Sequence, residues 1–423
     1  HYNMFHEYPL EGNPPMMTHF FENEKGERII AAKGAPEAIL NVSKLSDSQK
    51  EALQHKIHQF GKQGFRVLGV GKSNFEGSDF PKKQQDLKFD FLGFVVFYDP
   101  PKKGIQEVFK HIYDAGIKVK VITGDNAETT KTIAEKAGIK NASQTTTGTE
   151  ISHLDETKLQ KVSEEKTLFT RMFPEAKLSV INALKNNGEV VAMLGDGVND
   201  GPALKASHIG VAMGKKGTEI AKEAASVVLT NDDLGNLVTA IASGRRIYTN
   251  IKKAVQYIIS IHIPIILTVS LPLFLGWVYP QIFTPVHVIF LELVMGPTCS
   301  IVYENEPMEK NTMLRKPRPM TETFLNLREL MVSIIQGLVI TLGVLFIYQV
   351  TARSGGSEEL TRSMVFTTLI FSNILLSFCN RSFFYTTFET LKNKNNLLIY
   401  VTLITLAVLS LMIYFPPVSM FFK

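Results

Sequence analysis

The chain has 423 residues, of which 45% are hydrophobic, so it is long enough for two or three domains. Its formal net charge is only +5 at pH 7 and it has no lysine-rich tail, so nucleic acid is not an expected partner. The only two cysteines, Cys299 and Cys379, lie inside apolar runs, which excludes a disulfide framework and a zinc site. The chain opens on His1 in a strand-like run, and we expect it to be a piece of a longer protein.

The first part of the sequence predicts a small α+β unit. Residues 1–86 contain short strand-like runs and one helical stretch at 47–64, where Leu53, Ile57 and Phe60 recur at helical spacing.

From about residue 87 to 244, strand-like and helical patterns alternate. Strands are expected at 89–99, 118–125 and 189–196, with helices at 104–116, 126–138 and after 201. This alternation predicts a parallel sheet with crossover helices, in which ligands bind beyond the carboxyl ends of the strands.

The last part of the sequence is dominated by long apolar runs that predict membrane-spanning helices. Five spans are expected, at 254–276, 282–303, 330–350, 363–379 and 397–415. Basic residues gather before the first span, between the second and third, and after the fourth, at Arg245, Arg246, Lys252, Lys253, Lys310, Arg315, Lys316, Arg318, Arg381, Lys392 and Lys394. Because cytoplasmic loops carry the excess of Lys and Arg, residues 1–244 are expected in the cytoplasm, beside a cell membrane.

Two expected strand ends carry residues suited to phosphate chemistry. The second of them, GDGVND at 195–200, brings Asp196 and Asp200 into one turn, and we expect its glycines to supply positive backbone φ angles. Two carboxylates suit Mg²⁺, which takes one or two of them plus phosphate oxygens and water. Asn199 can hydrogen-bond a phosphoryl oxygen without adding charge.

The first strand end, TGD at 123–125, offers the Thr123 hydroxyl and backbone N–H groups at a helix N-terminus, a common seat for anions. Lys177 could neutralise a phosphoryl group during transfer. Each feature alone has an ordinary explanation, as a turn, a helix cap or a solvated lysine. Their combination in a parallel-sheet pattern favours a phosphoryl-transfer site.

Four motifs together resemble the P-type cation-transporting ATPases of the calcium-pump-like branch: KGAPEAIL, YDPPKKG, VITGDNAETTKTIAEKAGI and the run from GDGVND to VVL at 195–229. The resemblance covers essentially the whole chain. It implies a partial nucleotide-binding domain (1–97), a phosphorylation domain with the haloacid-dehalogenase-like Rossmannoid fold (98–244) and an all-α transmembrane domain (245–423). The expected fold class is therefore multidomain α/β plus all-α membrane.

The resemblance also implies roles for individual residues, with ATP as substrate and Mg²⁺ as cofactor. Asp196 matches the Mg²⁺ ligand, joined by Asp200 from the spacing argument above, and Asp99 matches the hinge into the phosphorylation domain. The remaining matches are phosphorylation-site residues (Thr123, Gly124, Asp125, Lys177, Asn199 and Asp200) and nucleotide contacts (Tyr8, Lys33, Arg66 and Arg171).

The sequence departs from the family pattern in one decisive respect. It contains no DKTGT motif, whose aspartate is the family's nucleophile, and the actuator domain, the first four membrane helices and the last one are also absent. Taken alone, the chain should not form an aspartyl-phosphate. We expect the missing half of the same pump, or a separate chain, as its partner.

Ionisable side chains inside spans are costly and indicate a function. Glu292 and His262 in the second and first spans, with Asn373 in the fourth, form the expected transported-cation site. Pro264 leaves the carbonyl of Ser260 without its helical partner, and Pro297 does the same for Leu293. By alignment, Ile265 and Gly296 replace family carboxylates, which argues against the six to eight oxygens that Ca²⁺ prefers.

The sequence therefore predicts ATP-driven cation transport through an aspartyl-phosphate cycle, in an incomplete chain. Two alternatives stay open. One is a split-subunit or non-catalytic membrane protein with a phosphate- and magnesium-binding domain. The other is a membrane-tethered phosphohydrolase, for which the only candidate nucleophile is Asp99.

Overall fold

The computed structural model describes residues 1–12, 14–75, 80–392 and 395–419. Lys394, one of the loop residues used above for orientation, lies outside these ranges, as does the end of the expected transmembrane domain at 420–423. The chain forms two compact units, His1–Leu237 and Val238–Lys423, and each is described by itself.

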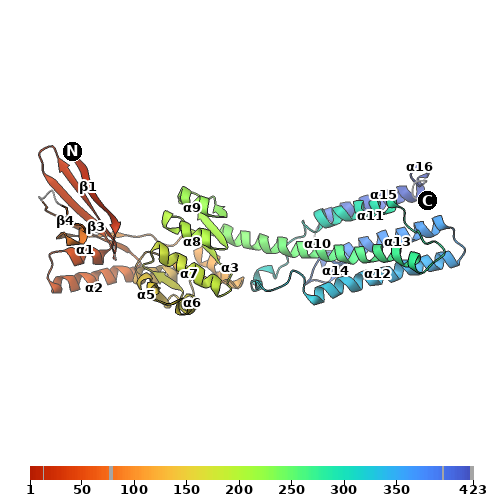
Figure 1. The fold of residues 1–423 in the computed structure, drawn as a ribbon, viewed down its shortest axis with the longest axis horizontal. Helices are drawn as coiled ribbons and strands as arrows, with labels where there is room; N and C mark the ends of the chain where they lie inside the picture. Colours follow the sequence, from red (N-terminus) through yellow and green to blue (C-terminus); the bar gives the residue numbers. More distant parts are fainter. Residues whose placement is uncertain (13, 76–79, 393–394, 420–423) are drawn as a thin grey trace. The chain divides into compact units, whose positions relative to one another are not determined.

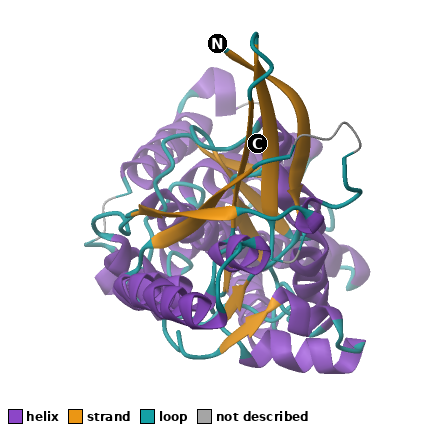
Figure 2. Ribbon diagram, turned by 90° about the vertical axis from the view of Figure 1, so that its left-hand side faces the viewer, coloured by secondary structure: helices purple, strands orange, loops and turns teal. Residues whose placement is uncertain are grey.

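The first unit opens with a five-stranded antiparallel sheet in the order β1-β2-β3-β4-β5 (Figures 1 and 2). Alternate residues of β2 and β3, among them Met16, Phe20 and Ile30, are fully buried in a core that they share with helix α1. The elements are β1 (Tyr2–Glu11), β2 (Met16–Asn23), β3 (Arg28–Gly34), α1 (Pro36–Val42), α2 (Asp47–Gln63), β4 (Arg66–Ser73), a 3-10 turn (Gln84–Asp86) and β5 (Asp90–Phe97).

Local sequence fixes the ends of α2. Ser46 and Gln49 form a reciprocal capping box at its start, and Gly64 ends it in the left-handed conformation (φ 84°). Ile57 is buried on its inner face, and the expected helix at 47–64 is therefore present almost residue for residue.

The expectation for the strand at 89–99 is wrong in one respect. That segment does not begin the parallel sheet, because β5 pairs antiparallel with β4, with Arg66 opposite Phe97. It is an edge strand and is not buried between helices, since Leu92 and Phe97 are exposed. Asp99 follows it in a segment without regular structure.

The rest of the first unit alternates strands and helices around parallel strands. The strands form two groups of three, β6-β8-β7 and β11-β10-β9, in which all pairs are parallel. The elements are α3 (Ile105–Asp114), β6 (Val121–Ile122), α4 (Ala127–Ala137), β7 (Thr145–Thr147), α5 (Gly148–Ser152), α6 (Glu156–Glu165), β8 (Leu168–Thr170), α7 (Pro174–Asn186), β9 (Ala192–Gly195), a 3-10 turn (Val198–Asp200), α8 (Gly201–Ala206), β10 (Ile209–Met213), α9 (Glu219–Ala224) and β11 (Val227–Leu229).

Five helices in the described part of the chain are long and apolar enough to cross a membrane: α10 (Gly235–Phe274), α11 with its π-helical continuation (Pro285–Val302), α12 (Leu327–Arg353), α13 (Glu358–Cys379) and α15 (Asn396–Tyr414). A 3-10 turn (Thr312–Leu314) and the short helices α14 (Thr387–Thr390) and α16 (Pro416–Ser419) complete this unit. Helix α10 begins well before residue 254, because the polar stretch ahead of the span continues the same helix. The expected fold class, α/β followed by all-α membrane, is confirmed.

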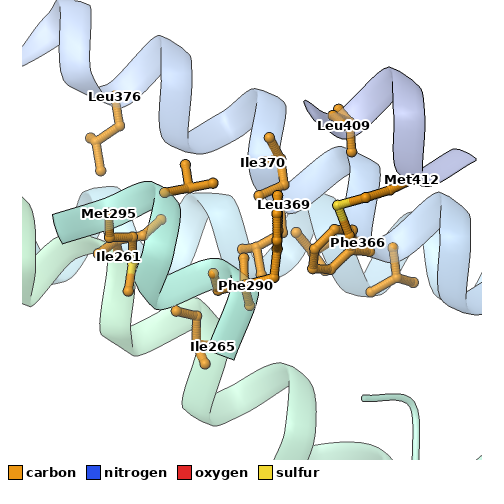
Figure 3. Close-up of a cluster of buried hydrophobic side chains, with 14 of the residues drawn as sticks. Ile261, Ile265, Phe290, Met295, Phe366, Leu369, Ile370, Leu376, Leu409 and Met412 are labelled. Carbon is orange, nitrogen blue, oxygen red and sulfur yellow. The ribbon is translucent and has the colours of Figure 1, made fainter. Parts of the chain in front are cut away.

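An apolar core joins the five long helices, and Figure 3 shows part of it. It contains Ile261 and Ile265 of α10, Phe290 and Met295 of α11, Val344 and Tyr348 of α12, Phe366, Leu369 and Ile370 of α13, and Leu409 and Met412 of α15. Many side chains on the outer faces of the same helices are large, apolar and exposed, as on Leu273, Leu342 and Leu403, which suits contact with lipid.

Helices α10 and α12 approach each other at Gly337. A Cβ atom at this position would lie 2.8 Å from the carbonyl oxygen of Ser260 and 2.8 Å from the Cβ of Ile263. Small residues allow such backbone contact between membrane helices. The carbonyl that Pro264 frees in α10 therefore lies against the backbone of α12.

We expect Gly337→Ala to destabilise the membrane unit by about 1–3 kcal/mol, because the added methyl group must separate two backbones. Thermal unfolding of the chain in detergent micelles measures the change. Gly343→Ala, in the same helix but with nothing within 4 Å of its Cβ, is the matched control. Equal midpoints for the two variants would contradict the packing argument.

Candidate functional site

The turn after β9 is organised by an ion pair between Lys177 and Asp200. Lys177 Nζ lies 2.6 Å from Asp200 Oδ1, and both side chains are nearly buried, at 12% and 10% exposure. The other carboxylate oxygen of Asp200 accepts the Gly197 N–H at 3.3 Å. Asp196 and Asn199, by contrast, are exposed at the strand end. The turn thus exposes the Asp196 carboxylate and the Asn199 amide beside the Lys177–Asp200 ion pair, whose two charges neutralise each other.

The glycines of this turn are needed for a reason other than the expected one. Gly195 and Gly197 are not among the residues with positive φ, and Gly197 has φ −110°. Instead, a Cβ on Gly195 would lie 2.7 Å from the Cβ and 3.0 Å from the Cγ of Asp200. Gly195 is therefore required for space, because the chain folds back onto its own carboxylate.

Backbone hydrogen bonds connect the TGD strand end to this ion pair. The Thr123 carbonyl accepts the Met172 N–H at 2.9 Å, and the next residues start α7, which carries Lys177. Thr123 Oγ1 accepts the Asp125 N–H at 3.1 Å, while Gly124 is exposed beside it. The short segment 172–177 therefore runs from the hydrogen bond with Thr123 to Lys177. Among the described residues, no hydrogen bond joins Thr123 directly to Asp196.

The four expected nucleotide contacts do not share one cluster. Tyr8 lies in an aromatic group with His6, Phe20 and Phe80, and its hydroxyl donates to the carbonyl of Pro81. Burial raises the pKa of Tyr8, and the nearby charge of Asp86 adds to this. Lys33, on β3, is exposed.

The two expected nucleotide-binding arginines are already paired with carboxylates. Arg66 Nε lies 3.4 Å from Asp125 Oδ1. Arg171 Nη2 lies 2.9 Å from each carboxylate oxygen of Glu37. Glu37 was not singled out from the sequence, although it is the last residue of the KGAPE motif.

Sequence reasoning also missed Asp232, which shapes the loop after β10. Its two carboxylate oxygens accept the N–H groups of Lys215 and Lys216, both at 3.0 Å, and its carbonyl accepts Lys102 Nζ at 2.7 Å. The same loop ends at Thr218, whose N–H donates to the Asp196 carbonyl at 2.9 Å. Asp232 therefore supports the backbone beside Asp196. A positive φ of 57° in a buried aspartate cannot be read from the sequence.

The donor set at the turn fits a magnesium ion held mainly by substrate. The described residues contain no group of three or more His, Cys, Asp or Glu side chains placed to hold a metal. Asp200 already neutralises Lys177, so the exposed carboxylate of Asp196 is the available ligand. Mg²⁺ commonly takes only one or two protein carboxylates, with water and phosphate completing its shell.

The expected cation-site residues divide into two places. His262 Nε2 lies 3.5 Å from Glu292 Oε1, and their side chains are 41% and 59% exposed. Asn373 is instead buried beside Tyr257, whose hydroxyl donates to its Oδ1 at 2.7 Å. Within the described residues no acceptor meets the Asn373 amide nitrogen, and no hydrogen bond or ion pair joins Asn373 to the His262–Glu292 pair. Ile265 lies in the apolar core.

Several basic residues used above for orientation are paired with buried carboxylates. Lys253 Nζ lies 3.1 Å from Glu309, which Arg315 also contacts at 3.2 Å, and Arg381 Nε lies 2.8 Å from Glu306. Burial acts to raise the pKa of Glu309, but the charge of Lys253 and several hydrogen bonds overcome it, so the net shift is downward. The acidic run after the second span, YENEPMEK, was the available sequence signal.

Comparison with known proteins covers both units. Residues 15–208 match the haloacid dehalogenase-like hydrolase family, and residues 280–423 match the family described as cation transporting ATPase, C-terminus. The chain is 30% identical over 432 residues to the calcium-transporting ATPase type 2C member 1 of Bos taurus and to that of Homo sapiens. It is also 30% identical over 437 residues to a calcium-transporting ATPase of Bacillus subtilis (strain 168).

The chain belongs to the calcium-pump-like P-type ATPases. The alignments cover 99% of this chain with the bovine and human proteins and 100% with the bacterial one. The chain spans only about half the length of these relatives, from 44% to 48%. As a P-type ATPase chain with five long apolar helices among its described residues, it is a multi-pass membrane protein.

Gly195→Ala should destabilise this P-type ATPase chain by about 1–3 kcal/mol, because the methyl group displaces the Asp200 carboxylate from Lys177. The thermal midpoint of the detergent-solubilised chain reports the effect. Gly197→Ala is the matched control, since its Cβ would lie 3.8 Å from the nearest Asp200 atom and its φ suits any residue. A larger drop in thermal midpoint for Gly197→Ala than for Gly195→Ala would contradict the requirement for space at Gly195.

Asp232 predicts a pH dependence of stability. The Lys215 N–H, together with those of Lys216 and Gly214, lowers the pKa of Asp232 below its ordinary 3.8, although burial opposes the shift. A lowered pKa in the folded state stabilises the protein above the ordinary value, and this stabilisation is lost as the pH falls through the folded-state pKa.

Asp232→Asn should therefore lower the thermal midpoint most above about pH 5. The difference in midpoint between the variant and the unsubstituted chain should narrow as the pH falls below the ordinary pKa of an aspartate. Midpoints measured from pH 7 to pH 3 test this. Asp114→Asn, at an exposed position on α3, controls for the loss of a surface charge. A gap that stays constant across this range would rule out the carboxylate as its source.

Proposed function

We propose that the chain supplies the nucleotide, magnesium and membrane parts of an ATP-driven cation pump that works through an aspartyl-phosphate. The observation that carries the proposal is the nearly buried Lys177–Asp200 pair at the carboxyl end of β9, in a chain that also holds five apolar helices. The relatives named calcium-transporting ATPases support the same reaction class.

Each residue of the turn has a chemical task in this proposal. Asp200 takes up one of the three N–H donors of Lys177, and the others remain for phosphoryl oxygens. The Thr123 hydroxyl accepts a bond from Asp125 and keeps its own proton to donate. Asp196 would hold the metal, which supplies charge neutralisation at the phosphoryl group. Such positioning and neutralisation account for most of the catalysis in phosphoryl transfer.

The phosphorylated aspartate must come from elsewhere, because this sequence has no DKTGT. We propose the missing half of the same pump, or a separate chain, as the partner that provides it. In this arrangement residues 1–244 are cytoplasmic, and the helices of the second unit lie in a cell membrane.

The transported cation is proposed to pass the His262–Glu292 pair. One carboxylate and one imidazole are few ligands for Ca²⁺, which takes six to eight oxygens. A proton or another small cation fits this pair better, whereas the names of the relatives favour calcium. A flux assay separates the two.

The membrane-tethered phosphohydrolase receives no support from the geometry. Its nucleophile would have to be Asp99, and this residue follows an edge strand of the antiparallel sheet instead of the end of a parallel strand. The split-subunit alternative agrees with every contact described above. Acid-stable labelling distinguishes it from an independent enzyme.

The first test uses the chain in lipid nanodiscs. With γ-labelled ATP, the chain alone should give no acid-stable label, and labelling would overturn the proposal. It should bind ATP in a Mg²⁺-dependent manner. Asp196→Asn should remove the Mg²⁺ dependence, and Lys177→Ala should weaken binding about tenfold, the value of one charged hydrogen bond. Asp114→Asn is the control, and Mg²⁺-independent binding by the unsubstituted chain would count against the site.

The second test concerns the cation. Vesicles containing the complete pump should lose ATP-driven flux of the transported ion on Glu292→Gln, measured against a panel that includes H⁺ and Ca²⁺. Glu304→Gln, outside the apolar helices, is the control. Unchanged flux for every ion would exclude Glu292 from the pathway.

A further inference from the structure

Arg171 has a backbone conformation that is uncommon for a residue with a side chain. Its φ is +51°, in the left-handed region, where only two other non-glycine residues of the described chain are found. Such a conformation persists where the surrounding structure over-determines it, and it often marks a functional constraint.

The main chain around Arg171 contacts the TGD strand end and Gly148. Its N–H donates to the Asp125 carbonyl at 3.0 Å, and the next residue, Met172, donates to the Thr123 carbonyl at 2.9 Å. Its carbonyl oxygen packs against Gly148, since a Cβ atom added to that glycine would lie only 2.5 Å from this oxygen. The main chain of Arg171 is thus fastened to the TGD strand end.

The side chain of Arg171 reaches in the other direction, to the antiparallel sheet. Its Nη2 bonds both oxygens of Glu37 in the first turn of α1, directly after the strand that carries Lys33. Both side chains are mostly shielded, at 25% and 34% exposure. Charge-assisted bonds of this kind are shorter and stronger than neutral ones.

A second pair crosses the same boundary with the charges reversed. Arg66 of β4 lies 3.4 Å from the Asp125 carboxylate, and the Phe65 carbonyl accepts the Thr129 hydroxyl at 2.9 Å. Asp125 therefore binds Arg66 through its carboxylate and Arg171 through its carbonyl. The TGD strand end is tied to the sheet from two sides.

We propose that Glu37 is a positioning residue which, by holding Arg171, fastens the KGAPE turn to the TGD strand end and keeps the nucleotide and phosphate sides of the site together. This inference rests on the proposed function, since it assigns Glu37 to the same site. Glu37 does not itself touch the phosphoryl group. It acts through the guanidinium and the constrained backbone of Arg171.

Hydrogen-deuterium exchange on the chain in nanodiscs tests the proposal without any need for activity. Glu37→Ala should raise the exchange rate of residues 121–127 about fivefold, the scale of a partly exposed ion pair. Glu37→Gln keeps the shape of the side chain and should also raise the exchange rate of residues 121–127. It replaces Glu37→Ala in the experiment if the alanine variant does not fold. Glu51→Gln, exposed on α2, is the matched control and should change nothing.

A charge swap supplies the decisive readout. The double variant Glu37→Arg with Arg171→Glu should recover at least half of the protection lost in Glu37→Ala. The affinity for ATP should fall about fivefold in Glu37→Ala. Unchanged exchange in Glu37→Ala and Glu37→Gln, or no recovery in the swap, overturns the proposal. If the unsubstituted chain does not bind ATP, the proposed function fails, while the exchange experiment still decides the role of Glu37.

Discussion

The Lys177–Asp200 ion pair is the constraint on which the turn after β9 and its surroundings depend. A carboxylate in this position is tolerable only because a lysine from α7 lies 2.6 Å away, and removing one partner of a buried pair costs about 3–5 kcal/mol. The pair also explains the neighbouring sequence. Gly195 must lack a side chain so that Asp200 can fold back, and α7 must start where Met172 is bound to Thr123. Asp196, in contrast, stays exposed at the end of β9.

Much of this could be predicted from the sequence, because the signals are local and periodic. Helix α2 has a capping box, a buried Ile57 and a glycine terminator, and each is a short-range feature. The apolar helices follow from runs of about 20 residues. The strand at 89–99 was misassigned because an apolar run does not say whether it is covered by helices or pairs at an exposed edge. That distinction depends on the pairing with β4, the preceding strand, which the run itself does not reveal.

The site was predictable in its residue types and less so in its pairings. Spacing predicted that Lys177 and the aspartates belong to one centre, but not that Asp200 would be neutralised by the lysine while Asp196 stays free. Likewise, the sequence did not show that Arg66 and Arg171, both expected to bind nucleotide, each have a carboxylate partner. Asn373 was grouped with Glu292 because both are polar and within spans. Helix rotation, which no single-span pattern fixes, turns Asn373 inward and Glu292 outward.

The contact at Gly337 bears on how force can travel within the membrane unit. Where two helices touch through side chains, rotamer changes let one slide past the other. At Gly337 the α12 backbone meets the carbonyl of Ser260 and the side chain of Ile263 directly, because glycine adds no side chain of its own. A backbone cannot change rotamer to make room, so sliding of the proline-containing segment of α10 past α12 meets steric resistance at this point.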